Sequence, residues 1–494
     1  MQKTRRLLQT IKMLSQPKVV RATELAQIFG ISERTVYRDI KTLVGAGIPI
    51  RGEAGVGYQL RRLNSKSGIR RQTIESLDTA GLSLENTLSY ICSPITDGSR
   101  RQAMQIPIAK PWFDEDEYKA VQKPLQTGWV VQGPEVEKFE SSVCEFTKAA
   151  GAAACTSATT GLHLALNALC IGLGDEVIVP SFSFVASANS VLYNRARPVL
   201  VDIDLDTFNV TAESIYSAIS SKTRAIMPVH LFGQAAPMDQ IMEIAQQHNL
   251  AVIEDTACAL GTTYQDQHVG TFGEFGVFSF HPRKVISTGE GGMLITRNTD
   301  YMDSIRSLRS HGISPKQKSS DGDTPGFLLG DFDRLGYNYR MTDMQGALGR
   351  VQMQKLPKIL ARKRELAHRY DTHLKSLDWL RTPKVKAGGD HSYQAYVCLF
   401  TPKEPNQSNW EELYKKRNAL MNRLAEKGIA TRQGTQAIHG LSLYSNEFGY
   451  QPMDLPNAWI AEKLSIALPL YPQMTDAEQD YVIDMLTEAG VAVS

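Results

Sequence analysis

Residues 275–284 read FGVFSFHPRK, and residues 289–295 read GEGGMLI. The first stretch begins as an apolar strand and ends in a polar turn that carries Lys284, and the second is a glycine-rich return into another apolar strand. Glycine lets main chain approach closely, which places this lysine at a crowded strand end. A loop lysine is normally solvated on the surface, whereas a partly desolvated one is a nucleophile. The neighbouring sequence decides between these interpretations.

Short apolar runs alternate with helical patterns upstream of this stretch. Strands are expected at 176–179, 198–201, 225–229 and 251–254, and helices at 158–169, 184–193, 212–219 and 238–248. The alternation predicts an α/β fold with a mostly parallel sheet that is covered on both faces. Ligands of such sheets bind beyond the carboxyl ends of the strands. Downstream, a long helix at 342–374, a strand at 393–400 and helices at 409–427 and 476–488 predict a smaller domain that closes over the site.

Four positions near strand ends are candidates for one site. Residues 156–161 (TSATTG) precede an apolar helix, where free N–H groups suit a phosphate, although simple capping is the commoner role. Asp255 ends an apolar strand, so its carboxylate needs a partner, and a salt bridge or cap is the alternative. Phe184 could stack on a flat ring or pack in the core. Together with Lys284, these groups are what pyridoxal phosphate requires.

Residues 106–494 resemble the DegT-type sugar aminotransferases. The motifs that carry the resemblance include GWVVQGPEVEKFE, SATTGLHLALNAL, GDEVIVPSFSFVASANSV, VIEDTACALG, FSFHPRKVISTGEGG and GYNYRMTDMQGALGRVQ, in the order of the family. The resemblance implies a fold-type-I PLP-dependent aminotransferase that forms a homodimer. It also implies a PLP-binding large domain at 106–360 and a small C-terminal domain at 361–494.

The resemblance further implies roles for individual residues. Lys284 would hold the cofactor aldehyde as a Schiff base and shuttle protons, and Asp255 would pair with the ring nitrogen. The other cofactor-binding residues would be Ser157, Ala158, Thr159 and Ser279 at the phosphate, Phe184 on the ring, and Asn338 reaching the phosphate from the neighbouring subunit. The residues expected to line a sugar-nucleotide pocket are Trp129, Gln132, Gln433 and His439, and a structural role is the alternative for His439.

One position departs from the family pattern. Cys258 stands where Gln or His is usual, near the cofactor ring oxygen, and a thiol is a weaker hydrogen-bond partner. The implied reaction moves an amino group from glutamate to a keto group of a nucleotide-linked sugar. The residues of these motifs are most similar to those of perosamine-synthase-type members. This similarity favours amination at C4 of a 4-keto-6-deoxyhexose, and amination at C3 remains the alternative.

The first 71 residues have a different character. They hold fifteen Lys/Arg and four Asp/Glu, a net charge of +11, so the remainder carries −9 because the whole chain carries +2. Helical patterns at 3–15, 23–29 and 32–43, with Gly30 in the turn, and a hairpin at 48–61 resemble the DeoR-like winged helix-turn-helix over residues 1–63. The residues that would face DNA are Ser32, Arg34, Thr35, Tyr37 and Arg38. Residues 64–105 are expected to form a linker, with a helix at 74–91.

Composition limits the other function classes. No apolar run is long enough to span a bilayer, and no signal-peptide pattern is present. The six cysteines form no CxxC pair, so a cytoplasmic protein with reduced thiols and no metal site is expected. The fused basic domain leaves two further hypotheses open: a transcription regulator with a PLP-binding sensor body, and an enzyme that represses its own operon.

Overall fold

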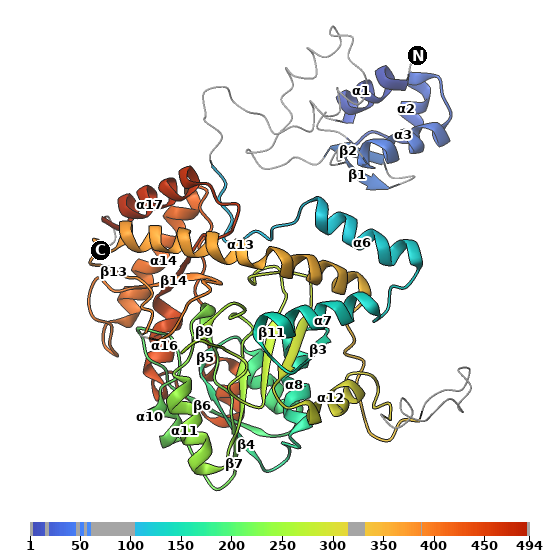
Figure 1. Ribbon diagram of the computed structural model, residues 1–494. Helices are drawn as coiled ribbons and strands as arrows, with labels where there is room; N and C mark the ends of the chain where they lie inside the picture. Colours follow the sequence, from blue (N-terminus) through green and yellow to red (C-terminus); the bar gives the residue numbers. More distant parts are fainter. Residues whose placement is uncertain are drawn as a thin grey trace. The chain divides into compact units, whose positions relative to one another are not determined.

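The computed structural model describes residues 3–14, 19–45, 50–53, 57–60, 104–314, 331–386 and 388–491. Its contacts divide the chain into two units, Met1–Ala103 and Met104–Ser494 (Figure 1). The predicted linker at 64–105 lies outside the described residues except for its last two, and so does the helix expected at 74–91. The two units are therefore considered one at a time.

The N-terminal unit contains three helices and a hairpin. The helices are α1 Lys3–Leu14, α2 Ala22–Phe29 and α3 Glu33–Gly45, and β1 Ile50–Glu53 pairs antiparallel with β2 Gly57–Leu60. The turn between α2 and α3 uses Gly30 in the left-handed region, with φ 63°. The buried Arg6 guanidinium donates to Asp39 at 2.6 Å, which fixes α1 against α3. The expected winged helix-turn-helix is confirmed in its described elements.

A seven-stranded sheet forms the centre of the second unit. Its strands, in spatial order, are β3 Gly151–Cys155, β12 Gly292–Thr296, β11 Phe275–Ser279, β8 Ala251–Asp255, β7 Thr223–Ile226, β4 Glu176–Pro180 and β6 Arg197–Val201. Only β12 runs antiparallel to its neighbours, so the prediction of a mostly parallel sheet is confirmed. The strand pair β11–β12 is the hairpin that residues 275–295 predicted.

Helices cover both faces of this sheet. Alternate residues of β11 point to opposite sides: Val277 packs in the core beneath α8 Ala158–Ala168, and Phe278 packs against α7 Pro134–Thr147 and α13 Asp343–Leu374. Farther along the sheet, α11 Met238–His248 covers β4, β7 and β8 through another buried cluster. The expected two-sided cover is thus present (Figure 1).

Some elements differ from the expectations. The expected helix at 184–193 is α9 Ala186–Tyr193, which leaves Phe184 in the preceding loop. Neither the edge strand β3 nor the helices α6 Glu115–Thr127 and α7 were predicted. β3 reads GAAAC and lacks the β-branched and aromatic residues that mark strands, yet all five of its residues are buried.

The small C-terminal region is built on a three-stranded sheet in the order β13-β14-β16, with β13 Leu380–Arg381, β14 Tyr396–Phe400 and β16 Ser465–Leu468. Its main helices are α14 Trp410–Glu426, α16 Pro456–Leu464 and α17 Asp476–Val491. A capping box precedes α17, because Thr475 N–H donates to Glu478 at 2.8 Å and Glu478 N–H donates to the Thr475 hydroxyl at 3.2 Å.

The long helix α13 connects the two parts of this unit. Met353, Leu356 and Ile359 lie in the core of the large sheet, whereas Leu366 and Tyr370 lie in the core of the small one. The boundary expected at 360 therefore falls inside a continuous helix of 32 residues. The other α-helices and strands of the described residues are α10 Ala212–Ser217, α12 Met302–Leu308, α15 Ser442–Phe448, β5 Phe182–Ser183, β9 Thr263–Tyr264, β10 Gln267–His268 and β15 Gln436–Ala437.

Candidate active site

The sheet register brings the candidate residues to one edge. Asp255 ends β8 and pairs with Val277 of the parallel strand β11, whose end leads to Lys284. Ser279 at the end of β11 pairs with Gly292, and Gly292 pairs in turn with Cys155, just before the start of α8. Because these strand ends are adjacent, the residues that follow them converge on the same region.

Asp255 carries a buried carboxylate with neutral partners. It is 5% exposed, accepts from Ser187 Oγ at 2.7 Å and accepts from Ala257 N–H at 3.1 Å. Because Ser187 gives its only proton to Asp255, the contact at 2.9 Å between the Ser183 and Ser187 hydroxyls must be donated by Ser183. No cation pairs with Asp255 among the ion pairs of the described residues, so the salt bridge considered for it is absent there. Sequence reasoning missed Ser187, which lies in the first turn of α9.

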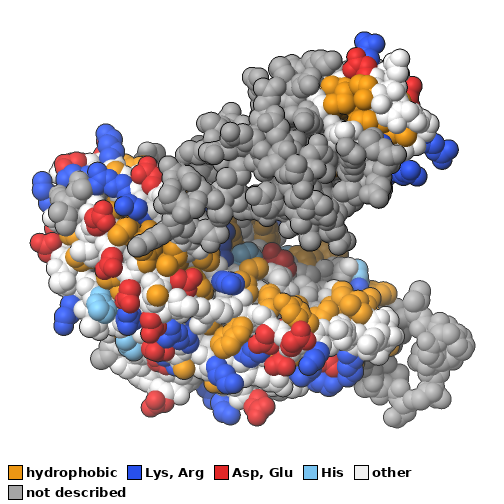
Figure 2. All heavy atoms as spheres, turned by 90° about the horizontal axis from the view of Figure 1, so that it is seen from above, with side chains coloured by type: hydrophobic (Ala, Val, Ile, Leu, Met, Phe, Trp, Pro, Cys, Tyr) orange, Lys and Arg blue, Asp and Glu red, His pale blue; other side chains and the backbone are white. Residues whose placement is uncertain are grey.

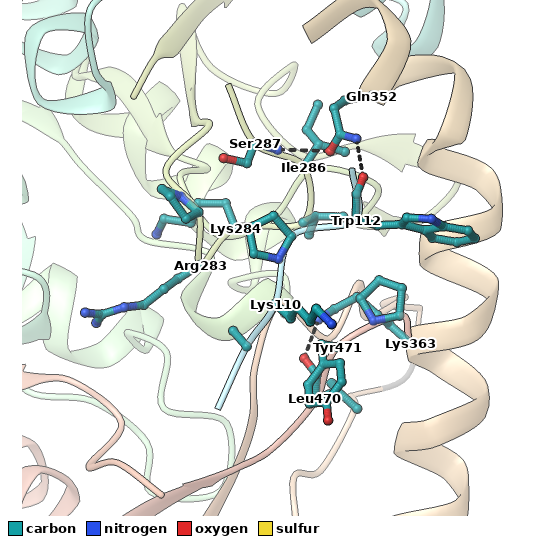
Figure 3. Close-up of a pocket in the computed structure, with 15 residues that line it drawn as sticks. Lys110, Trp112, Arg283, Lys284, Ile286, Ser287, Gln352, Lys363, Leu470 and Tyr471 are labelled. Atoms are coloured by element: carbon teal, nitrogen blue, oxygen red, sulfur yellow. Dashed lines mark hydrogen bonds between the residues drawn. The ribbon is translucent and has the colours of Figure 1, made fainter. Parts of the chain in front are cut away.

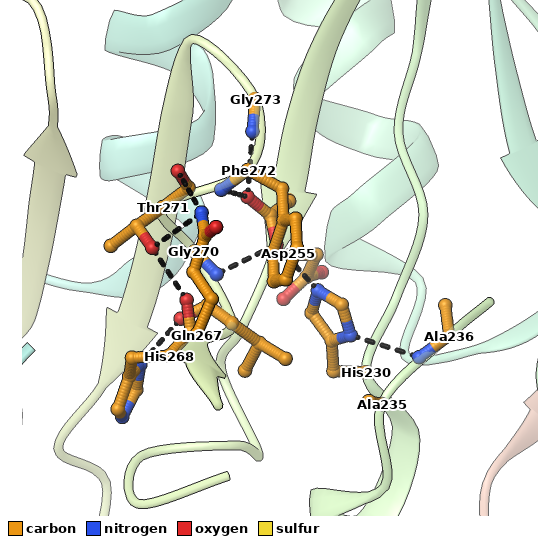
Figure 4. Close-up of polar contacts among 12 residues, drawn as sticks. His230, Ala235, Ala236, Asp255, Gln267, His268, Gly270, Thr271, Phe272 and Gly273 are labelled. Carbon is orange, nitrogen blue, oxygen red and sulfur yellow. Dashed lines mark hydrogen bonds and ion pairs between the residues drawn. The ribbon is translucent and has the colours of Figure 1, made fainter. Parts of the chain in front are cut away.

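The carboxylate of Glu254, next to Asp255 in the sequence, fixes the loop that contains residues 270–273 (Figure 4). Glu254 is fully buried and accepts N–H bonds from Gly270, Phe272 and Gly273 at 2.6 to 2.9 Å. His230 Nδ1 accepts from Ala236 N–H, so its Nε2 carries the proton that is donated to Glu254 at 2.9 Å. His230 N–H also bonds to the Asp255 carbonyl at 3.0 Å. These bonds fix the end of β8 from which Asp255 projects.

Lys284 is half-buried and has no carboxylate partner among the described residues. Its Nζ donates to Cys258 Sγ at 3.1 Å. Lys284 also lines a pocket with Lys110, Arg283 and Lys363, and none of the fifteen lining residues is acidic (Figure 3). Burial lowers the pKa of Lys363 to about 7, because its amine meets only the carbonyls of Gln394 and Leu470. Lys110 and Arg283 therefore supply the positive charge of the pocket.

The start of α8 offers free backbone donors. Ser157 Oγ accepts from Thr160 N–H at 3.2 Å, as a helix cap. The described residues record no acceptor for the N–H groups of Ala158 and Thr159, which are the first two of the helix. A Cβ at Gly292 would collide with the backbone of Ser157 and Ala158, so glycine is needed where β12 passes this turn. Free donors at a helix N-terminus fit a phosphate group.

Two predicted cofactor residues project into solvent. Phe184 is 64% exposed, so its ring is free on the surface and does not pack in the core. Asn338 is exposed on a segment that pairs with Ser310. A buried carboxylate, an amine without a counter-ion, free helix donors and an uncovered aromatic ring together fit pyridoxal phosphate.

The four residues predicted to line a sugar pocket have different environments. Trp129 is 56% exposed, and its indole donates to the Gln132 carbonyl at 3.3 Å. The side-chain oxygen of Gln132 is buried without a hydrogen-bond partner among the described residues. The side-chain amide of Gln433 donates to the Thr435 carbonyl at 3.0 Å. His439 is fully buried: Nδ1 meets the Ser181 hydroxyl at 2.7 Å and Nε2 meets the Pro452 carbonyl at 2.9 Å. Both of its ring nitrogens are thus engaged within the protein.

In the N-terminal unit, α3 presents a basic face. Arg34 and Arg38 are exposed, as predicted for DNA contacts, and Lys41 continues the same face at helical spacing. Ser32 Oγ instead caps α3, accepting from Thr35 N–H at 3.3 Å and meeting the Thr35 hydroxyl at 3.0 Å. Tyr37 is partly buried, packs against the core, and its hydroxyl donates to Glu33 at 3.3 Å.

Two absences hold for the described residues. They contain no helix that could cross a membrane, and no group of three or more His, Cys, Asp and Glu side chains that could hold a metal ion.

Comparison with known proteins places both units. Residues 6–59 match an HTH domain, and residues 111–487 match the DegT/DnrJ/EryC1/StrS aminotransferase family. The chain is 36% identical over 383 residues to the spore coat polysaccharide biosynthesis protein SpsC of Bacillus subtilis, covering 78% of this chain and 96% of SpsC.

Solved structures agree with the match of residues 111–487 to this aminotransferase family. Spr1654 of Streptococcus pneumoniae in its PLP form has a TM-score of 0.72 and 27% identity, covering 79% of this chain and 100% of that one. PseC of Helicobacter pylori, an aminotransferase of pseudoaminic acid biosynthesis, has a TM-score of 0.71 and 26% identity at the same coverages. The expected fold-type-I architecture is thereby confirmed, and the chain belongs to the DegT/DnrJ/EryC1/StrS aminotransferase family.

Proposed function

We propose that the protein is a pyridoxal-phosphate-dependent aminotransferase that moves an amino group from glutamate to C4 of a nucleotide-linked 4-keto-6-deoxyhexose. The observation that carries the proposal is the buried carboxylate of Asp255, without a cation partner among the described residues, on the strand next to the one that leads to Lys284. SpsC and PseC, through their roles in polysaccharide and pseudoaminic acid biosynthesis, support a sugar substrate.

In this proposal each residue has a task. When bound, pyridoxal phosphate supplies a carbonyl that exchanges for an amino group and a ring that withdraws electrons from the substrate carbon. Lys284 holds the cofactor and moves a proton to and from the substrate carbon through Nζ. Asp255 stabilises the protonated ring nitrogen, and Ser187 orients its carboxylate. The N–H groups of Ala158 and Thr159 receive the phosphate, together with the hydroxyls of Ser157 and Ser279.

The substrate side of the proposal rests on charge and exposed rings. Phe184 covers one face of the cofactor ring, and Trp129, Gln132 and Gln433 line the sugar pocket. The residues beside Lys284 include Lys110 and Arg283 and no acidic side chain, so their positive charge would attract the anionic diphosphate of an approaching nucleotide sugar. His439 supports the pocket wall through its two buried bonds.

We also propose a homodimer in which Asn338 reaches the cofactor phosphate of the partner subunit. Apolar side chains gather in patches on the face of the body shown in Figure 2. Among the large hydrophobic residues, Val131 is 62% exposed, Phe332 53% and Leu335 85%. Exposed apolar surface of this kind favours association with another chain.

The test is a direct assay of amino transfer. The purified protein is loaded with pyridoxal phosphate and mixed with glutamate and a 4-keto-6-deoxyhexose nucleotide, and 2-oxoglutarate is measured. Lys284→Ala should reduce its formation to background, while Lys358→Ala, a change at an exposed lysine outside the pocket, should leave it unchanged. Formation of 2-oxoglutarate by Lys284→Ala at the wild-type rate would rule the mechanism out. Product analysis by NMR separates C4 from C3 amination.

The basic face of α3 supports a second candidate activity, DNA binding, which belongs either to a regulator with a sensor body or to an enzyme that represses its own operon. Arg34, Arg38 and Lys41 would contact phosphates or base edges in the major groove. Arg38→Ala should weaken binding of the protein to the promoter region of its own operon. It should also reduce the slope of log binding constant against log salt concentration by about one. Lys427→Ala, a change at an exposed residue of the other unit, should leave the DNA affinity and its salt dependence unchanged. Unchanged DNA binding in Arg38→Ala, and also in Arg34→Ala and Lys41→Ala, would contradict this proposal.

A further inference from the structure

Cys258 and Lys284 form a thiol–amine pair that the amino-transfer reaction does not require. Cys258 lies three residues beyond Asp255, and Lys284 lies five residues beyond the end of β11. Their side chains meet at 3.1 Å between Nζ and Sγ. That separation is already in the range from which two reacting atoms can form a bond. No backbone rearrangement is needed to bring them together.

The surroundings favour reaction between these two groups. Lys284 has no carboxylate partner among the described residues, so nothing recorded there competes for its amine. All five described cysteines are free, and the described residues record no second thiol in contact with Cys258 that could form a disulfide. Cys258 is half-buried, so a small oxidant can reach it, whereas Cys155 and Cys398 are buried.

We propose that Cys258 and Lys284 are a peroxide-responsive pair that closes into a sulfur–nitrogen bond. In the first step the Cys258 thiol and a peroxide, such as hydrogen peroxide, give a sulfenic acid and water, so the sulfur is oxidised and the peroxide is reduced. In the second step the lone pair of the neutral Lys284 amine attacks that sulfur. The S–N bond forms, the S–O bond breaks, and hydroxide leaves with the amine proton as water. A thiol reductant such as dithiothreitol reverses the closure: the S–N bond breaks, the reductant is oxidised to a disulfide, and its two hydrogens restore the Cys258 thiol and the Lys284 amine.

The closure would couple oxidation to cofactor binding. An amine bonded to sulfur cannot react with an aldehyde, so the linked form would no longer hold pyridoxal phosphate. Conversely, cofactor attached to Lys284 would leave no free amine to attack Cys258. The protection of Lys284 by bound cofactor rests on the proposed function. Closure of the sulfur–nitrogen bond rests only on the contact at 3.1 Å between Nζ and Sγ. The two parts can therefore fail separately.

Peptide mapping by mass spectrometry tests the pair. The full-length protein is treated with hydrogen peroxide in three forms: as purified, loaded with pyridoxal phosphate, and after incubation with glutamate, which frees the lysine. We expect one linked species that joins the Cys258 and Lys284 peptides with a mass two hydrogens below their sum. It should be abundant after glutamate, strongly reduced in the loaded protein, and lost on treatment with dithiothreitol.

Variants of the chain supply the controls. Cys258→Ser should abolish the linked species, while Cys170→Ser, a change at an exposed cysteine, should leave it unchanged. Lys284→Arg should let Cys258 proceed to sulfinic acid, because no amine captures the intermediate. Sulfinic or sulfonic acid at Cys258 with Lys284 still free in the wild-type protein would overturn the proposal. Equal linkage in all three forms would keep the pair and instead reject cofactor attachment at Lys284.

Discussion

Asp255 illustrates how far single residues could be interpreted in advance. Its place at the end of an apolar strand indicated a carboxylate that needs a partner, and the structure supplies Ser187 and the Ala257 N–H instead of a cation. That partner could not be derived from the sequence, because Ser187 is distant from Asp255 along the chain and only the fold brings the start of α9 to the end of β8. Cys258 was noted as a departure, but its contact with Lys284 also depends on the fold.

Ser187 provides a prediction at this scale. Ser187→Ala removes the hydroxyl that donates to Asp255 at 2.7 Å and leaves a buried carboxylate oxygen without that bond. A hydrogen bond to a charged group contributes about 1.5–3 kcal/mol, so the affinity for pyridoxal phosphate should fall about tenfold or more. Fluorescence titration of the apo-protein measures this change.

The matched control is Ser190→Ala on the same helix. Ser190 is equally buried, but its hydroxyl donates to the Ser187 carbonyl at 2.8 Å and does not touch Asp255. It should leave cofactor affinity within about twofold of wild type, a difference of less than 0.5 kcal/mol. Equal losses in both variants would mean that the effect is general damage to α9.

At the scale of elements, regular hydrophobic patterns were predicted well and weak ones were missed. The predicted strands at 176–179 and 251–254 and the helix at 238–248 lie within one residue of β4, β8 and α11. The strand expected at 225–229 lies too late, since β7 is Thr223–Ile226 and Pro228 cannot donate to a ladder. β3 was missed because its small side chains carry no strand signal, although all five of its residues are buried and it forms one edge of the sheet.

The hairpin of β9 and β10 leads to a prediction on pH. His268 at its end is buried, accepts from Gly261 N–H at 3.0 Å, and donates to the Val269 carbonyl. Burial lowers the pKa of His268 to about 4, whereas an unfolded histidine has a pKa of about 6.5. The unfolded chain therefore binds a proton first, so stability is fully present above pH 6.5 and is lost as the pH falls toward 4.

This effect amounts to about 3 kcal/mol between those pH values. Urea unfolding at a series of pH values should show the loss in the wild type and a flatter profile in His268→Gln. His248→Gln, a change at an exposed histidine, should keep the wild-type profile. A profile in His268→Gln as steep as the wild type would assign the acid sensitivity to other groups, such as His391, whose pKa burial also lowers, to about 3.

For the whole molecule, charge asymmetry and motif order indicated two functional parts, and the contacts divide the chain at Ala103 and Met104. Family membership could be inferred from sequence because its motifs are spread over the entire body. The sugar, its nucleotide and the DNA site could not be, since they depend on the shapes of surfaces formed by side chains from distant segments. Gln132, with a buried oxygen lacking a partner among the described residues, is one such position.

A truncated chain of residues 104–494 tests the independence of the body. Its cores are contained within that unit, so the fragment should fold, bind pyridoxal phosphate and transfer amino groups with the kcat of the full chain. Circular dichroism and the 2-oxoglutarate assay check both points. A folded fragment with impaired turnover would show that the N-terminal unit takes part in catalysis.

The shared helix α13 constrains how this family member can vary in length. Each residue added to or removed from an α-helix turns everything beyond it by about 100° and shifts it by about 1.5 Å. Between Leu360, in the large core, and Leu366, in the small one, a single deletion would rotate one set of apolar side chains away from its sheet. Insertions in the evolutionary history of the chain should therefore fall in loops, and this six-residue interval should behave as a fixed spacer.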